Sequence, residues 1–72
     1  MIRLKVKEIA KEKGISQSKL SRLADVNITT IQRIFNSPTT ANVNLYTLDR
    51  IAKALGVNVT DLIESVPDDE PE

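Results

Sequence analysis

The sequence of 72 residues contains no cysteine and no histidine, and these two absences restrict its chemistry. Without cysteine the chain has no disulfide and no thiolate, and without histidine it lacks the most common general base and transition-metal ligand. No pair of carboxylates clusters within the part that is expected to fold. We therefore expect no enzymatic activity, no cofactor and no metal site.

Long apolar stretches are also missing. A membrane span needs roughly 20 consecutive apolar residues, and no run in this chain approaches that length. The first 14 residues are charged throughout and lack the apolar core of a secretory signal. These features predict a cytoplasmic protein with no membrane partner. The chain is expected to form one domain, near the lower size at which a hydrophobic core alone suffices.

The formal net charge is zero, but the charge is distributed unevenly. Residues 1–36 hold eight basic side chains against three acidic ones, and residues 37–72 hold two basic against seven acidic ones. The two halves therefore carry +5 and −5. Such an asymmetry indicates a surface that binds a polyanion, since phosphate binding is largely electrostatic. The alternative is a solvated surface whose charge is merely uneven.

Residues 14–36, GISQSKLSRLADVNITTIQRIFN, predict two short helices joined by a tight turn. Ser16 and Asn27 can each cap a helix, because their side-chain oxygens can accept a backbone N–H of the first turn. Apolar residues follow each cap at helical spacing: Leu20, Leu23 and Ala24, then Ile31, Ile34 and Phe35. The other side of the second helix carries Thr29, Arg33 and Asn36. Such a face is either recognised by a partner or simply solvated.

A preceding helix is predicted over residues 5–13, with an inner face formed by Val6, Ile9 and Ala10. Gly14 can end this helix in a left-handed conformation, with Ile15 covering the cap. Before it, apolar residues alternate with Arg3 and Lys5 from Ile2 onward, which favours a short strand or extended arm. The only partner strand that we identify is the same arm of a second copy. The alternative is a frayed end whose Ile2 and Leu4 pack on the core.

Two helices are predicted after the loop that contains Pro38. Asn44 caps the first, which runs over residues 45–55 and ends at Gly56. Its apolar residues repeat at helical spacing: Leu45, Leu48, Ile51, Ala52 and Leu55. The second starts at Asn58, where Asn58 and Asp61 resemble a capping box, and it buries Leu62 and Ile63.

These elements predict an all-α fold, a compact five-helix domain over residues 1–65 whose second and third helices are joined by a tight turn. Residues 66–72, VPDDEPE, hold two prolines and four acidic residues, so we expect a disordered acidic tail. The residues interpreted as core only are Leu20, Leu23, Ile31, Ile34, Leu48, Ile51 and Leu55.

Residues 6–63 resemble the phage-repressor type of helix-turn-helix domain, the Cro/C1-type or XRE-like family. The family places Gln at the start of the second helix, Leu three residues later, Val in the turn, Ile in the third helix and LxxIAxALGV in the fourth. This chain has Ser16-Gln17, Leu20, Val26, Ile31 and, over residues 48–57, LDRIAKALGV. The match covers about four-fifths of the chain.

The chain also departs from the family pattern. Ser21 replaces the usual Ala, and Asp25 replaces the usual Gly of the turn, where Asp tolerates a left-handed backbone better than most residues. Phe35 and Ser37 stand where the family often has Glu and Gly, and Ala10 stands where some members have Arg. An apolar contact between Ala10 and Phe35 is expected in place of the buried Arg–Glu pair.

The resemblance implies a repressor-like, sequence-specific transcriptional regulator that reads the major groove of double-stranded DNA with its third helix, residues 28–36. The residues implied to contact bases are Asn27, Ile28, Thr29, Gln32 and Arg33. Those implied to contact phosphates are Ser16, Gln17, Lys19, Arg22, Asn36, Thr39 and Thr40. One such domain makes few contacts, so a homodimer is expected on DNA.

Alternatives remain for several of these roles. Ile28 lies about 60° around the helix from Ile31, which also suits a core residue, and Gln17, Lys19, Thr39 and Thr40 also suit an ordinary solvated surface. The alternative function is a protein-interaction module of the same fold, such as an antitoxin that binds its partner through the acidic tail. Toxin-binding tails are usually longer and more hydrophobic than residues 66–72.

Overall fold

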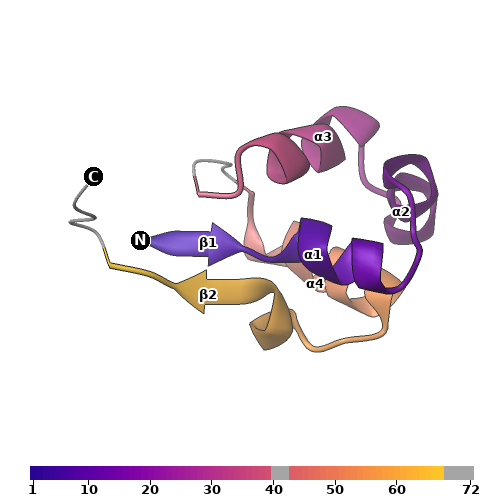
Figure 1. The fold of residues 1–72 in the computed structure, drawn as a ribbon. Helices are drawn as coiled ribbons and strands as arrows, with labels where there is room; N and C mark the ends of the chain where they lie inside the picture. The colour runs from indigo at the N-terminus through magenta and orange to yellow at the C-terminus, as the bar shows by residue number, and fades with distance from the viewer. Residues whose placement is uncertain (40–42, 68–72) are drawn as a thin grey trace.

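Four α-helices and a two-stranded sheet form the part of the chain that the structure describes, residues 1–39 and 43–67 of a computed structural model. The elements are β1 (Ile2–Leu4), α1 (Val6–Glu12), α2 (Gln17–Ala24), α3 (Ile28–Asn36), α4 (Leu45–Leu55), the 3-10 helix η1 (Val59–Leu62) and β2 (Ile63–Ser65). Figure 1 shows α3 on one side of the molecule and η1 with β2 on the other. Of the acidic tail predicted to be disordered, residues 66–72, the last five residues, 68–72, lie outside the described residues.

The prediction of a fifth α-helix after Asn58 is wrong. The predicted capping box is present, with the Asn58 N–H donating to Asp61 Oδ2 at 3.2 Å, but only the four-residue η1 follows it. The carbonyl of Leu62 accepts a hydrogen bond from the Lys5 N–H at 2.8 Å, and Ile63 has the extended dihedral angles φ −119° and ψ 132°. Pairing with the N-terminal segment therefore replaces a further helical turn.

The N-terminal segment forms a strand, but its partner is not a second copy. β1 pairs antiparallel with β2 of the same chain, with the register Ile2↔Ser65, Arg3↔Glu64 and Leu4↔Ile63. The backbone pairing continues to Val66, whose N–H donates to the carbonyl of Met1 at 2.9 Å. Leu4 is buried, whereas Ile2 is 51% exposed, so only one of these two side chains packs on the core.

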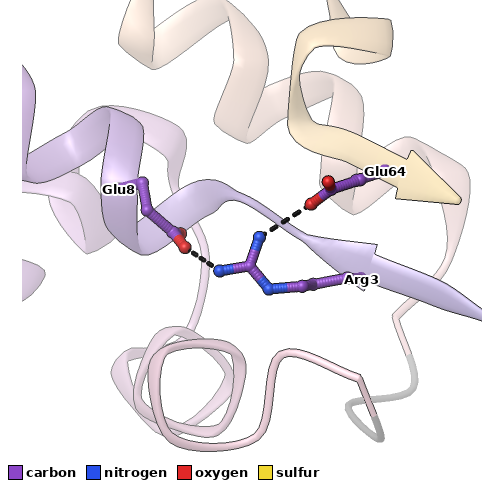
Figure 2. A network of polar contacts seen from close by, with 3 residues as sticks. All are labelled: Arg3, Glu8 and Glu64. Atoms are coloured by element: carbon purple, nitrogen blue, oxygen red, sulfur yellow. Dashed lines mark hydrogen bonds and ion pairs between the residues drawn. The ribbon is translucent and has the colours of Figure 1, made fainter. Parts of the chain in front are cut away.

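Arg3 joins β1 to two neighbouring elements (Figure 2). Its Nη1 lies 2.8 Å from Glu64 Oε1 on β2, and its Nη2 pairs with Glu8 Oε2 on α1. The bonds to Glu64 and Glu8 raise the pKa of the Arg3 guanidinium above its ordinary value. All three side chains are partly exposed, so solvent screens these ion pairs and they act mainly to align β1, α1 and β2.

The predicted helix caps are confirmed. The side-chain oxygens of Ser16, Asn27 and Asn44 accept the N–H groups of Lys19, Thr29 and Thr47 at 3.1, 2.7 and 2.8 Å. Gly14 and Gly56 follow α1 and α4 in the left-handed region, with φ of 70° and 74°. The N–H groups of Ile15 and Val57 then bond back to Ala10 and Ala52 at 2.9 and 3.0 Å, which closes both helix ends.

The core lies where all four α-helices, β1 and η1 meet. Its buried residues are Leu4, Val6, Ala10, Leu20, Ala24, Ile31, Ile34, Leu48, Ile51, Ala52, Leu55 and Leu62. Two residues of the predicted apolar stripes lie outside it, since Leu23 is 53% exposed and Leu45 is 71% exposed. The assignment of Leu23 to the core is therefore wrong. No helix in the described part of the chain has the length and apolar character that crossing a membrane requires.

Candidate nucleic-acid interface

The turn between α2 and α3 consists of Asp25, Val26 and Asn27. Asp25 takes the left-handed conformation, with φ 56° and ψ 48°, and it is the one non-glycine residue with positive φ in the described chain. The N–H groups of Asp25 and Val26 donate to the carbonyls of Arg22 and Ser21, at 3.3 and 3.0 Å. These bonds end α2 and redirect the chain into α3 within three residues, as the sequence predicts.

Substitution at Asp25 should show how much this left-handed turn depends on the residue. Asp25→Ala is expected to lower the free energy of unfolding by about 1 kcal/mol, because a Cβ disfavours this conformation and alanine has no polar side chain to offset it. Asp25→Gly is expected to stay within about 0.5 kcal/mol of wild type, because glycine relieves the backbone but gains freedom when unfolded. Urea denaturation of the three proteins measures both values. Equal stabilities for the alanine and glycine variants would contradict the assigned turn.

α3 has one buried side and one exposed side. Ile31 and Ile34 are fully buried, and Phe35 packs against the core from a half-buried position. The exposed side chains of this helix are Thr29, Gln32, Arg33 and Asn36. Ile28 is half-buried and packs against the core, so the structure places it at the border between the two sides. α3 thus presents a polar face above an apolar anchor.

Asn27 is exposed at the start of this face, but one of its functional groups is already engaged. Its Oδ1 accepts the Thr29 N–H at 2.7 Å and caps α3. The side-chain NH₂ group takes no part in this cap, so Asn27 can offer its two N–H donors to a partner while Oδ1 holds the cap. This division follows from the hydrogen bonding of an amide, which has an acceptor at one atom and donors at the other.

The predicted phosphate-binding residues lie at the cap of α2 and along it, at the last residue of α3 and in the segment after α3. Ser16 is exposed, with its hydroxyl oxygen engaged as the α2 cap, and Gln17 beside it is half-buried. Lys19, Arg22, Asn36 and Thr39 are exposed. Thr40 lies outside the described residues. The structure therefore brings most of the set onto two helices that are adjacent and joined by the turn, as Figure 1 shows.

Positive charge on this pair of helices is not neutralised locally. Within the described residues, Lys19, Arg22 and Arg33 form no salt bridge, whereas Lys53 on α4 pairs with Asp49 at 3.2 Å. Of the six acidic residues in the described part of the chain, only Asp25 lies at this helix pair, in the turn, and the other five are carried by α1, α4, η1 and β2. No group of three acidic side chains in the part that the structure describes is arranged to hold a metal ion. The surface of α2 and α3 can therefore attract an anionic partner.

Two contacts at the turn were not predicted from the sequence. The Ser21 hydroxyl donates to the carbonyl of Val26 at 2.5 Å, and Arg50 Nη1 donates to the carbonyl of Asp25 at 3.3 Å. The replacement of the family's Ala by Ser21 was a signal that this position differs, although it did not reveal the acceptor. Arg50 gave no signal, because its partner lies 25 residues away in the sequence.

Comparison with known proteins places this geometry in a family. No curated protein sequence matches the chain. The family model described as the Cro/C1-type HTH DNA-binding domain matches residues 5–68. The chain is also similar to SinR in a SinR–SinI protein complex, with 30% identity, a TM-score of 0.71 and coverage of 79% of this chain. It spans about half of that SinR chain, 54%.

The chain is similar to two other solved structures of SinR. The master regulator for biofilm formation SinR, in complex with DNA, is 30% identical, with a TM-score of 0.71 and coverage of 78% of this chain and 87% of that one. The N-terminal DNA-binding domain of SinR from Bacillus subtilis is 29% identical, with a TM-score of 0.73 and coverage of 92% and 91%. The matched region includes α2, the turn and α3. The chain belongs to the Cro/C1-type helix-turn-helix DNA-binding domain family.

Proposed function

We propose that this protein is a sequence-specific transcriptional regulator that inserts α3 into the major groove of double-stranded DNA. The observation that carries the proposal is the polar face of α3, where Thr29, Gln32 and Arg33 are exposed on a helix whose opposite side is buried in the core. A helix held in this way presents side chains to base edges without moving its backbone. The related SinR has been solved in complex with DNA, which supports the same partner here.

Each exposed residue of this face has a chemical role in the proposal. Arg33 can donate two hydrogen bonds to the O6 and N7 atoms of a guanine, and Gln32 can pair with an adenine or flank that contact. Thr29 can bond either kind of base edge, and the NH₂ group of Asn27 can donate to an acceptor. Ile28 contributes its exposed edge to a thymine methyl group while the rest of its side chain packs on the core.

Phosphate contacts are assigned to the surface around this face. Lys19 and Arg22 supply positive charge without an ion-pair partner among the described residues. Gln17 and the N-terminal N–H groups of α2 can bond a phosphate, as can Ser16 through its hydroxyl hydrogen. Asn36 and Thr39 can bind the opposite strand, and Thr40 is assigned the same role from the sequence. These contacts position the protein without specifying the base sequence.

We also propose that residues 1–65 form the DNA-binding domain, with residues 66–72 as an acidic tail, and that two copies bind together. A single domain makes few base contacts, whereas two copies on half-sites about one helical turn apart multiply the specificity. The proposed site of action is DNA in the cytoplasm.

A protein-interaction role is the second candidate, and one observation favours it. A related SinR chain has been solved in complex with SinI, although the present chain spans only 54% of that SinR. In this alternative, as in an antitoxin, the fold binds a protein and does not read DNA independently. The exposed cations of α2 and α3 favour DNA as the partner. In a domain that binds a protein only through its tail, these side chains would be solvated and would have no role in binding.

Selection from random-sequence duplex DNA tests the proposal directly. The full chain is expected to enrich a defined sequence, and its affinity should fall as the salt concentration rises, because bound Lys and Arg side chains release counterions. The measurement is a set of binding isotherms for the enriched duplex and for an unrelated duplex at several salt concentrations. Absence of binding at low salt would refute the DNA proposal and leave the protein-interaction role.

A further inference from the structure

Two carbonyl groups of the turn between α2 and α3 accept hydrogen bonds from side chains of different elements. Ser21, a half-buried residue of α2, reaches across the turn to the carbonyl of Val26. Arg50, on α4, donates to the carbonyl of Asp25. The turn is therefore held from within the helix pair and also from a helix outside it.

We infer that Ser21 and Arg50 are positioning residues that fix the orientation of α3 and thereby determine how accurately it reads DNA. The inference rests on the proposed function and extends it to residues that need not touch the DNA. It is carried by the two bonds to consecutive carbonyls, at Asp25 and Val26, in the three-residue turn that connects the recognition helix to the rest of the domain.

The conformation of Asp25 explains why the turn needs such restraints. A left-handed conformation costs a non-glycine residue energy, so other contacts must favour it over its right-handed alternatives. The Asp25 carbonyl also belongs to the C-terminal end of α2, where carbonyls lack helical partners and carry partial negative charge. The Arg50 guanidinium satisfies this group with a donor of the right charge. The backbone of Arg50 is held in place, because the next residue of α4, Ile51, is fully buried.

A small change in the conformation of this turn would displace the far end of α3 by a larger distance. A nine-residue helix is roughly 13 Å long, so a 10° tilt about its N-terminus moves its far end by roughly 2 Å. Hydrogen bonds to base edges tolerate only a few tenths of an ångström, whereas phosphate contacts made by flexible cationic side chains tolerate more. Loss of a restraint should therefore reduce affinity for the correct sequence more than affinity for DNA in general.

Arg50→Met tests this inference, since methionine keeps an unbranched stem but removes the guanidinium. Lys53→Met is the matched control, because it removes one positive charge from the exposed side of the same helix, where Lys53 pairs only with Asp49 among the described residues. Binding isotherms are measured for each variant with the duplex that the wild type enriches and with an unrelated duplex, at several salt concentrations. Arg50→Met is expected to lower the ratio of the two affinities about fivefold, the effect of losing one hydrogen bond, with the salt slope unchanged. Lys53→Met should leave the ratio at the wild-type value.

Two results would overturn the assignment of Arg50. Equal losses of affinity for both duplexes, with a salt slope less negative by about 1, would identify Arg50 as a phosphate ligand. A wild-type affinity ratio, even with a lowered melting temperature, would limit it to a role in stability. The wild-type protein failing to select any sequence would instead count against the proposed function itself.

Amide hydrogen exchange decides the positioning role without DNA. In Ser21→Ala and in Arg50→Met, the amides of Thr30 and Ile31, which bond to the Asn27 carbonyl at 3.0 and 3.2 Å, are expected to exchange several-fold faster. The amides of Ile51 and Ala52 in α4 should keep their wild-type rates. Unchanged exchange at Thr30 and Ile31 in both variants would refute the inference, whether or not the protein binds DNA.

Discussion

Replacing Leu20 with alanine is expected to lower the free energy of unfolding by about 3 kcal/mol. Leu20 is fully buried in the core, and a Leu→Ala change at such a position removes apolar contacts and leaves a cavity. A domain of this length has a total stability of roughly 4–11 kcal/mol, so the variant would retain a much smaller margin. Thermal unfolding should show a midpoint lower by roughly 12–24 °C, and urea denaturation gives the free energy directly.

Leu23 offers a matched control three residues further along α2. The same Leu→Ala change is made there on a side chain that is 53% exposed, where it should alter the stability by no more than about 0.5 kcal/mol. Alanine also has a slightly higher helix propensity than leucine, which offsets the loss of partial contacts at both positions. Similar losses at Leu20 and Leu23 would mean that α2 is rotated relative to the arrangement described above.

The contrast between these two leucines shows what periodicity can and cannot predict. Leu20 and Leu23 both fit the spacing of a helical stripe, and the spacing alone does not say how far the covering helices extend over it. Leu45 is a similar case, because it continues the pattern of Leu48 and Ile51 but is 71% exposed at the first turn of α4. The width and end of a stripe depend on neighbouring elements, which the sequence does not place.

Local signals correctly predict where α2, α3 and α4 begin. The capping groups of Ser16, Asn27 and Asn44 bond to N–H groups two or three residues away, so the relevant information lies within one turn of the chain. The pairing of β1 with β2 depends instead on residues such as Arg3 and Glu64, which are 61 positions apart. A three-residue strand has too little sequence to identify a partner at that distance, so the sequence predicts a helix where β2 forms.

The same distinction applies to the candidate site. The two sides of α3 follow from its 3.6-residue period, and the structure confirms that Ile31 and Ile34 are buried while Thr29 and Arg33 are exposed. The helical angle of Ile28 suits either a core residue or a base contact. Its half-buried position in the structure is compatible with both roles. The Arg50 contact with the turn was inaccessible to sequence reasoning, because it requires knowing that α4 passes beside the end of α2.

Arg33→Ala is expected to lower the affinity for the selected DNA sequence roughly 5- to 150-fold and to relax the preference at one base-pair position. This is the effect of losing one bidentate contact to a base, worth about 1–3 kcal/mol. Arg33 is exposed, and no acidic side chain in the described residues pairs with it, so a lost salt bridge would not account for the result. The measurement is a repeated selection, followed by isotherms on duplexes that vary one base pair at a time.

Two further variants separate base reading from simple charge. Arg33→Lys keeps the positive charge but loses the planar fork, so it should retain the affinity for unrelated DNA and still lose selectivity. Arg22→Ala removes one positive charge from an exposed position on α2, where a phosphate contact is proposed. It should weaken binding to all sequences and make the salt slope less negative by about 1. If Arg33→Ala and Arg22→Ala instead gave the same uniform loss, Arg33 would be a phosphate ligand. Base recognition would then have to come from Thr29, Gln32 or the NH₂ group of Asn27, the other exposed hydrogen-bonding groups proposed to contact bases.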